Sequence, residues 1–348
     1  MDVQTGILDN YSDTRLARLE AETIARKFST EASWLRNRID QIIAGIENRV
    51  IERILVSRLR KAMRHSASEA AAEKLISEMR TDYETGALET MPSFFPRKYH
   101  AVPDDQHGTP ANKKNWRQRL LYVPGGGFIF PPSRKQKSML QRLSQETDSE
   151  VIVGTHRLAP EEPFPAAPND IAQRFIALTG EDETDEPLFL GADTAGASVA
   201  LGAVQLLKAK NARLPDGIIL FSPWCDLSLS GWSYITRSIS AQSPFRMETA
   251  AFCARMYLQR HSATDPLASP VFASLEGWPP ILIHTSENDL HFDDAIQLAE
   301  NGEKENCRVR LHYWDSPRHH LERLSSRDAE NSFREVRQFM AENGFSQH

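Results

Sequence analysis

The sequence has few of the features that mark a membrane-spanning, secreted or nucleic-acid-binding protein. Its 348 residues contain no apolar run of about 18 residues, and the mean hydropathy is −0.47. The first residues, MDVQTGILDNYSD, lack the basic and apolar stretches of a signal peptide. There are 41 basic and 47 acidic residues, a net charge of −6, so the basic excess of a nucleic-acid or anionic-membrane surface is missing. We therefore expect a cytoplasmic protein with no membrane span and no nucleic-acid partner.

Cysteine is also scarce. The chain has only Cys225, Cys253 and Cys307, which are odd in number and far apart in the sequence. This excludes a disulfide framework and the CxxC pattern of many zinc and redox sites. We expect three reduced thiols, mostly buried as small core residues.

Glycine and proline are nearly absent between residues 13 and 80, where apolar residues recur at helical spacing. This pattern predicts a helical segment within residues 1–90. A cap, a dimerisation arm and a partner-binding helix pair all fit the pattern. The clearest apolar run is Ile39, Ile42, Ile43, Ile46, Val50 and Ile54.

After about Pro92 short apolar runs alternate with helix-like stretches, which is typical of a mostly parallel sheet with helices on both faces. The longest interruption, at about residues 228–260, would suit a lid inserted after a central strand. The predicted strands are Leu120–Val123, Val151–Val153, Leu188–Leu190, Ile218–Phe221, Ile281–Ile283 and Val309–Tyr313. The predicted helices include Lys135–Thr147, Ala166–Leu178, Ala195–Lys208 and Asp294–Glu305.

In such sheets ligands bind beyond the carboxyl ends of the strands, so the strand-to-helix turns are the places to search. The first turn, Pro124-Gly125-Gly126-Gly127, carries three glycines whose N–H groups could face a ligand without an intervening Cβ. It lacks the Lys-Ser/Thr of a P-loop and the glycine spacing of a dinucleotide site, which disfavours nucleotide binding. Two interpretations fit this turn: a site that binds an oxyanion, and a tight turn that binds no ligand.

The second turn reads Ala192-Asp193-Thr194-Ala195-Gly196. Small residues on both sides of a hydroxyl residue, between a strand and a helix, are typical of a nucleophile elbow. The elbow normally reads G-x-S-x-G, so the hydroxyl is retained here with an added methyl group.

Two further turns carry an acid and a histidine. Asp289 follows the predicted strand at 281–283, while Asp293 and Asp294 fit the first turn of the next helix. His319 and His320 follow the last predicted strand. The chain order of hydroxyl, acid and histidine is that of α/β-hydrolase triads.

From about Leu120 to Phe339 the sequence resembles the hormone-sensitive-lipase-like division of the α/β-hydrolases, which includes plant carboxylesterase-like proteins. The most specific stretch, Arg157–Ala167, reads RLAPEEPFPAA and is similar to the family's YRLAPE…PFPAA. Supporting stretches are Ser222-Pro223-Trp224 with Asp226-Leu227, and Ser269-Pro270.

The resemblance implies an α/β-hydrolase fold in which residues 91–348 form the hydrolase domain. Residues 1–90 and the insertion at 228–260 would form a helical cap over the site. No metal or organic cofactor is implied, and a homodimer is compatible with the family. The implied catalytic residues are Thr194 as nucleophile, Asp289 as acid and His319 as base, with His320 as the alternative base; the implied oxyanion hole is Gly126, Gly127 and Ala195.

This chain also departs from the family pattern. Pro124 replaces the histidine of HGGG, which ordinarily helps to fix the oxyanion loop, and Thr194 replaces the nucleophilic serine. Ala192 and Ala197 replace two of the elbow's three glycines. A β-branched residue at positive φ is a conformational outlier, strained by about 1–3 kcal/mol.

The leading hypothesis is hydrolysis of a small or medium hydrophobic carboxylic ester by an esterase or lipase-like enzyme. One alternative is a lyase, either a dehydratase or a cyclase, since some plant relatives with threonine at the nucleophile position are dehydratases. His319 would then be a general base, and no acyl-enzyme would form. The other alternative is a non-catalytic relative that binds a small ligand under its cap.

Overall fold

The computed structural model describes residues 116–132, 134–180, 186–237, 247–314 and 327–344. The predicted helical segment at 1–90 lies outside the described residues, and so do His319 and His320.

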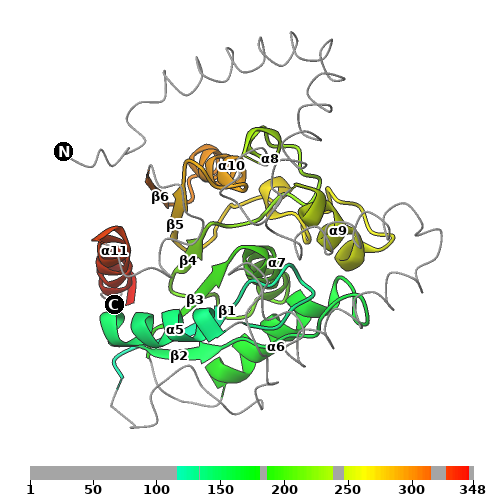
Figure 1. Ribbon diagram of the computed structural model, residues 1–348. Helices are drawn as coiled ribbons and strands as arrows, with labels where there is room; N and C mark the ends of the chain where they lie inside the picture. The colour runs from blue at the N-terminus through cyan, green and yellow to red at the C-terminus, as the bar shows by residue number, and fades with distance from the viewer. Residues whose placement is uncertain (1–115, 133, 181–185, 238–246, 315–326, 345–348) are drawn as a thin grey trace.

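The six strands of the described residues form one sheet in the order β2-β1-β3-β4-β5-β6, and every pairing is parallel (Figure 1). All six predicted strands are confirmed, with small changes at their ends. The strands are β1 (Arg119–Val123), β2 (Glu150–Val153), β3 (Leu188–Asp193), β4 (Ile218–Phe221), β5 (Ile281–Ser286) and β6 (Val309–Trp314).

The four predicted helices are also confirmed, and the described residues include three more. The helices are α5 (Arg134–Thr147), α6 (Ala166–Gly180), α7 (Ala195–Ala209), α8 (Ser233–Thr236), α9 (Met247–Leu258), α10 (Phe292–Lys304) and α11 (Arg327–Gly344); a 3₁₀ turn spans Pro270–Phe272. None of the described helices is long and apolar enough to cross a membrane.

The strand order contains a reversal at β1. The chain moves outward from β1 to β2 and then returns to place β3 on the opposite side of β1. Such a topological switch point opens a crevice at the carboxyl ends of the two strands, where ligands of α/β proteins bind. The triple-glycine turn leaves β1 and Thr194 follows β3, so both predicted turns lie at this crevice.

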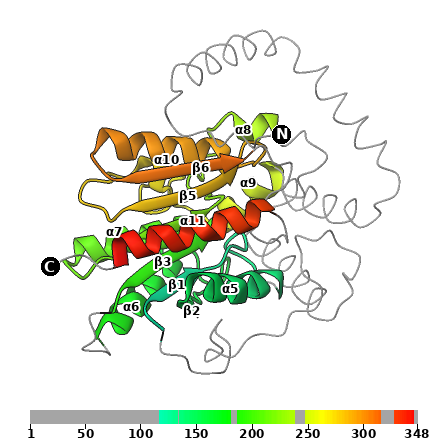
Figure 2. The same cartoon turned by 90° about the vertical axis from the view of Figure 1, so that its left-hand side faces the viewer.

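Alternating side chains along each strand divide the core into two layers. On β1, Leu121 and Val123 pack in the larger cluster, whereas Leu120 and Tyr122 pack in the smaller one. Helices α5 and α11 cover the face of the smaller cluster (Figure 2), and α6, α7 and α10 cover the opposite face. Both faces of the sheet are therefore buried, as its continuous apolar strands predict.

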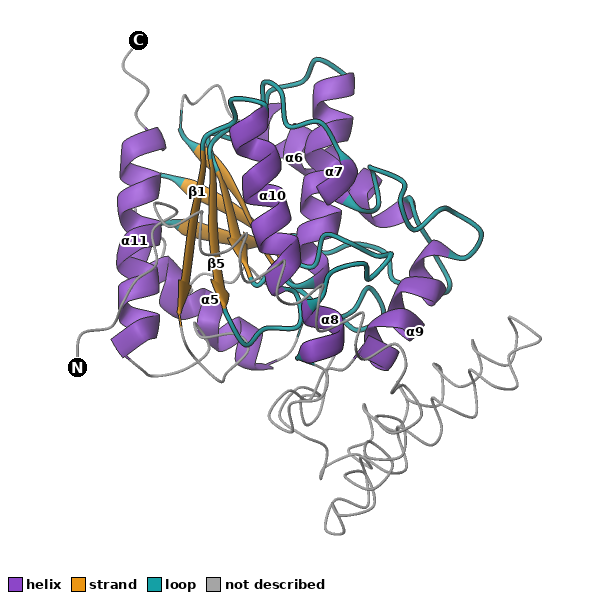
Figure 3. Ribbon diagram, turned by 90° about the horizontal axis from the view of Figure 1, so that it is seen from above, coloured by secondary structure: helices purple, strands orange, loops and turns teal. Residues whose placement is uncertain are grey.

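The predicted insertion between β4 and β5 contains α8 and α9. Viewed from above, both helices lie toward the end of the molecule to which the strand arrows point (Figure 3). This is the end at which the turns following β1, β3 and β5 are found.

All three cysteines lie within the described residues. Cys225, Cys253 and Cys307 are free and buried, so the expectation of isolated core thiols is confirmed. Burial raises the pKa of Cys253 to about 12 and that of Cys307 to about 11, which makes both thiols poor nucleophiles at neutral pH.

Candidate active site

Thr194 occupies a strained turn between β3 and α7. Its φ of 49° and ψ of −120° lie outside the regions that β-branched residues normally adopt. The residue is 2% exposed. Its N–H donates to the Phe221 carbonyl at 3.1 Å, and its own carbonyl accepts from the Trp224 N–H at 3.0 Å. Bonds to the last residue of β4 and to the turn after β4 therefore hold the strained conformation in place.

The structure explains which elbow glycine is retained. A Cβ placed on Gly196 would lie 2.2 Å from the Val123 carbonyl oxygen, a backbone atom that cannot yield without moving β1. Ala192 and Ala197, which replace family glycines, are both fully buried with their methyl groups inside the larger core cluster. The close approach of α7 to β1 thus requires glycine only at position 196.

The triple-glycine turn packs directly against this elbow. A Cβ on Gly125 would lie 2.7 Å from the Asp193 carbonyl oxygen and 3.0 Å from the Thr194 Cβ. One on Gly126 would lie 2.0 Å from the Phe130 carbonyl oxygen. Gly127 has a φ of +60°, and a Cβ there would lie 3.0 Å from Cys253 Sγ in α9. All three positions therefore exclude a side chain, each for a different reason.

Asp193, immediately before Thr194, joins the two turns. Its carboxylate is fully buried, and Oδ1 accepts hydrogen bonds from the Gly125 N–H at 3.0 Å and the Tyr122 hydroxyl at 3.1 Å. The Gln136 side-chain amide donates to the same carboxylate and to the Gly125 carbonyl. Sequence reasoning missed this network because Asp193 stands at the variable position of the elbow motif.

Asp289 lies in the turn between β5 and α10 and is 1% exposed. Its Oδ1 accepts from the His291 N–H at 3.0 Å, and its own N–H donates to the Ser286 carbonyl at 2.9 Å. The carboxylate thus helps to shape the turn that carries it. The structure confirms that Asp289 follows a strand, and the proposed histidine partner lies beyond the described residues.

Asp293 and Asp294 lie in the first turn of α10, as predicted, but they also bind other elements. Asp294 Oδ2 accepts from the backbone N–H groups of Cys225 and Asp226, at 2.7 and 2.8 Å, and from the Tyr234 hydroxyl at 2.8 Å. Burial, together with the charge of Asp226, raises the pKa of Asp294 well above its ordinary value. Asp294 therefore ties α10 to the turn after β4.

A row of aromatic rings in contact connects the turns around the site. Tyr257 of α9 lies against Phe128 of the glycine turn, with ring centroids 4.0 Å apart. Phe128 meets Trp224 at 5.2 Å, and Trp224 stacks on His291 at 5.3 Å. His291 in turn meets Tyr234 of α8 edge-on at 5.6 Å. The row joins the insertion, the glycine turn, the turn after β4 and the acid turn by direct packing.

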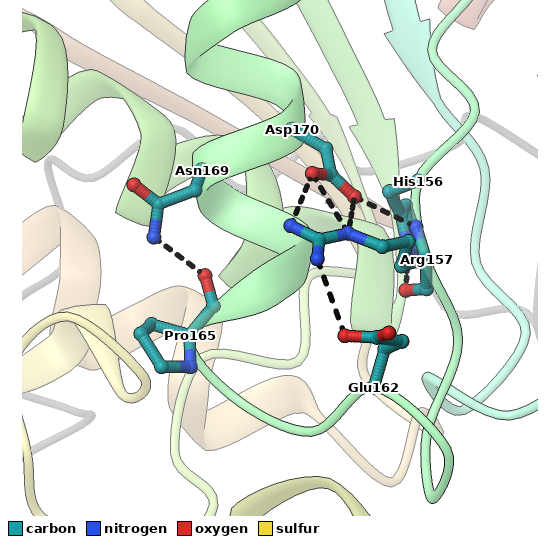
Figure 4. A network of polar contacts seen from close by, with 6 residues as sticks. All are labelled: His156, Arg157, Glu162, Pro165, Asn169 and Asp170. Carbon is teal, nitrogen blue, oxygen red and sulfur yellow. Dashed lines mark hydrogen bonds and ion pairs between the residues drawn. The ribbon is translucent and has the colours of Figure 1, made fainter.

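The Arg157–Ala167 stretch is a loop that leads into the first residues of α6, and an exposed ion-pair network fixes it (Figure 4). The Arg157 guanidinium pairs with Asp170 at 2.8 Å and with Glu162 at 3.2 Å. Burial opposes the charged form of Asp170, but its hydrogen bonds from Arg157 lower its pKa overall. The loop continues inward, where the Ala159 N–H donates to the Phe128 carbonyl at 3.0 Å. The motif therefore supports the glycine turn without contributing a reactive group.

The arrangement favours chemistry at a carbonyl group. A hydroxyl stands at the N-terminal end of α7, where the helix dipole stabilises developing negative charge. In the part of the chain that the structure describes, no group of three or more His, Cys, Asp or Glu side chains is placed to hold a metal ion.

Residues 120–322 match the family described as the alpha/beta hydrolase fold. The chain belongs to that family. It is 30% identical over 197 residues to an acetyl-hydrolase of Streptomyces hygroscopicus, covering 56% of this chain and 65% of the relative. It is 28% identical over 193 residues to an esterase of Acinetobacter venetianus, covering 55% and 63%. The matches thus span slightly less than two thirds of these curated relatives.

Solved structures of this α/β-hydrolase division are also similar. A hormone-sensitive lipase from a metagenome library has a TM-score of 0.61 and 27% identity, covering 65% of this chain and 78% of that one. The structure of EstE5 soaked with p-nitrophenyl butyrate has a TM-score of 0.64 and 25% identity, covering 83% and 98%. The resemblance to hormone-sensitive-lipase-like α/β-hydrolases is therefore confirmed.

Proposed function

We propose that this α/β-hydrolase is a carboxylesterase that cleaves small or medium hydrophobic esters. Thr194 Oγ1 attacks the ester carbonyl while His319 takes its proton, and Asp289 holds the resulting imidazolium. The tetrahedral oxyanion accepts hydrogen bonds from the backbone N–H groups of Gly126, Gly127 and Ala195. The alcohol leaves with a proton from His319, and water activated by the same histidine releases the acid.

The observation that carries the proposal is the contact between the glycine turn and the elbow. Thr194 adopts a strained positive φ, and Gly125 approaches so closely that a Cβ there would lie 3.0 Å from the Thr194 Cβ. A strained backbone conformation of this kind persists only where many surrounding contacts hold it in place, and such conformations are most frequent at active sites. The closeness of a hydroxyl, a glycine-rich turn and a helix N-terminus supports acyl chemistry over a passive turn.

The relatives' names support the substrate class, since they include an acetyl-hydrolase and an esterase. We further propose that residues 1–90 and 228–260 form the cap that sets acyl-chain preference. The stack of Tyr257 on Phe128 supports a role for the second segment beside the oxyanion loop.

The test is hydrolysis of p-nitrophenyl esters of increasing acyl length by the wild type and the Thr194→Ser, Thr194→Ala and His319→Ala variants. We expect turnover by the wild type, faster turnover by Thr194→Ser because the primary hydroxyl is less crowded, and loss with the other two. His320→Ala is the matched control, and it should retain activity if His319 is the base.

Activity that appears only in Thr194→Ser would argue against native ester hydrolysis and for the lyase alternative. That alternative draws on one feature of the sequence, the joint presence of Thr194 and Pro124 where the family has serine and histidine. Absence of ester turnover in every variant would contradict the esterase proposal and leave the lyase and the ligand-binding alternatives.

A further inference from the structure

We propose that Gln136 and Asp193 are a positioning pair that orients the oxyanion-hole N–H of Gly126. The inference rests on the proposed function, because it assigns these residues a role in that same site. Neither side chain touches the reacting atoms; both act through the backbone of the glycine turn.

The alternation of β3 explains how Asp193 reaches that turn. Phe189 of the same strand packs in the smaller core cluster, on the face covered by α5, and Asp193 is four residues further along with the same orientation. Gln136 lies in α5 and is 4% exposed, so the two side chains meet under the turn in a site closed to water. Tyr122, from β1 and the same face, donates to Asp193 Oδ1.

Both polar groups of Gly125 are bound by this network. Its N–H donates to Asp193 Oδ1 at 3.0 Å, and its carbonyl accepts from Gln136 Nε2 at 2.8 Å. Nε2 also lies 3.2 Å from Asp193 Oδ2. The two N–H protons of the Gln136 amide therefore have two acceptors, the Gly125 carbonyl and the Asp193 carboxylate.

Peptide planarity carries this constraint to the next residue. The Gly125 carbonyl and the Gly126 N–H belong to one trans peptide unit and point in opposite directions. Fixing the Gly125 oxygen against Gln136 therefore fixes the direction of the Gly126 N–H. In the next unit, the Gly126 oxygen accepts from the Phe130 N–H at 2.9 Å, which fixes the Gly127 N–H in the same way.

Glycine makes such fixation necessary, because three consecutive residues without Cβ atoms have the widest choice of backbone conformations. The family histidine that ordinarily helps to fix this loop is Pro124 here, and proline has neither a side-chain donor nor an N–H. Gln136 supplies a hydrogen-bond donor from the neighbouring helix. A pre-oriented N–H stabilises the oxyanion without having to reorient during the reaction, and this lowers the activation barrier.

The test compares Gln136→Glu and Gln136→Leu with the wild type. Leucine has no hydrogen-bond donor, and glutamate has at most one side-chain proton where the glutamine amide has two, so glutamate cannot donate to the Gly125 carbonyl and the Asp193 carboxylate at once. We expect kcat for p-nitrophenyl butyrate to fall about 10²-fold in both variants, the loss typical of removing one oxyanion-hole donor. We expect KM to change little, because the N–H acts on the transition state.

The matched control is Gln118→Glu. Gln118 is also a buried glutamine, 7% exposed, whose Nε2 donates to a backbone carbonyl, that of Thr147, at 3.0 Å. It precedes β1 and thus lies at the end of the sheet opposite the site. A loss of folding stability alone should affect the two glutamate variants alike, whereas the fall in kcat should be confined to position 136.

A folded Gln136→Leu variant with wild-type kcat would overturn the inference while leaving the esterase proposal intact. If the wild type and Thr194→Ser both lack ester turnover, the proposed function fails, and a crystal structure of Gln136→Leu decides the inference instead. A reoriented peptide between residues 125 and 126 would support it, and an unchanged peptide would overturn it. Gln136→Asn, which retains the amide on a shorter side chain, replaces Gln136→Leu if that variant does not fold.

Discussion

The ring of Tyr257 lies flat on the ring of Phe128, with centroids 4.0 Å apart and planes within 8° of parallel. Tyr257 belongs to α9, in the insertion between β4 and β5, and Phe128 directly follows the three glycines. Phe128 is itself held at a φ of 66°. The insertion and the glycine turn are therefore parts of one packed unit, and a change in α9 is expected to reach the site.

Tyr257→Ala should lower both stability and activity. Removing a buried aromatic ring typically costs about 3–5 kcal/mol, and the glycine turn would lose the ring that supports it. Tyr257→Phe keeps the stacked ring and should remain close to the wild type in both properties. Urea unfolding and ester kinetics measure the two effects. An alanine variant that is destabilised but retains full kcat would show that the stack does not position the turn.

Gly196→Ala should prevent formation of the elbow. The added methyl would lie 2.2 Å from the Val123 carbonyl oxygen, so α7 would have to move away from β1. We expect loss of soluble folded protein or of all ester turnover. Gly180→Ala is the control, because a Cβ there meets no atom within 4 Å. Circular dichroism and thermal unfolding of both variants check the prediction, which fails if Gly196→Ala matches Gly180→Ala.

Asp294→Asn should be tolerated far better than Asp294→Ala. Burial raises the pKa of the Asp294 carboxyl well above its ordinary value, which lowers the cost of replacing it with a neutral amide of the same shape. Asparagine retains an oxygen acceptor for Cys225 N–H, Asp226 N–H and the Tyr234 hydroxyl. Alanine leaves these buried donors unpaired and should cost at least about 2 kcal/mol. Equal destabilisation of the two variants, measured by urea unfolding, would contradict this account.

The stability of the protein should decrease as the pH falls below about 6.5, the ordinary pKa of histidine. His284 is fully buried between β4 and β6, and burial lowers its pKa despite a bond to Glu335 that opposes the shift. Since the folded-state pKa is the lower one, the unfolded state binds more protons in this range, and protonation favours unfolding.

The measurement is the free energy of unfolding of the wild type and His284→Gln at about pH 8 and about pH 5.5. The variant has no titrating group at this position, so its stability should depend less on pH. Glu335 does not titrate in this window: burial would raise its pKa, but hydrogen bonds from His284 and His312 lower it to about 2. Parallel pH dependence in the two proteins would exclude His284 as the source.

The sheet was predictable because each buried parallel strand is a short continuous apolar run, and the helices between them have clear periodicity. The elbow after β3 and the glycine turn after β1 were also predictable, because each is a motif of consecutive residues that can be recognised in the sequence. The need for glycine at position 196 was not predictable, because it depends on how closely α7 approaches β1.

The contacts that fix the site could not be predicted. Gln136 and Asp193 are 57 residues apart, and Asp294 lies 69 residues from Cys225. Such pairings depend on the order of the strands in the sheet and on the face of the sheet to which each side chain points. A local sequence pattern indicates neither. The predicted cap segment at 1–90 and the proposed base His319 lie outside the described residues, so both remain predictions.

Covalent labelling tests the central claim, that Thr194 is a nucleophile, most directly. A p-nitrophenyl phosphonate would lose p-nitrophenolate as Thr194 Oγ1 bonds to phosphorus, and His319 would accept the hydroxyl proton. Intact and peptide mass spectrometry should show one adduct on Thr194 in the wild type and in Thr194→Ser, and none in Thr194→Ala. An unlabelled wild type beside a labelled Thr194→Ser, or an adduct on another residue, would contradict the account.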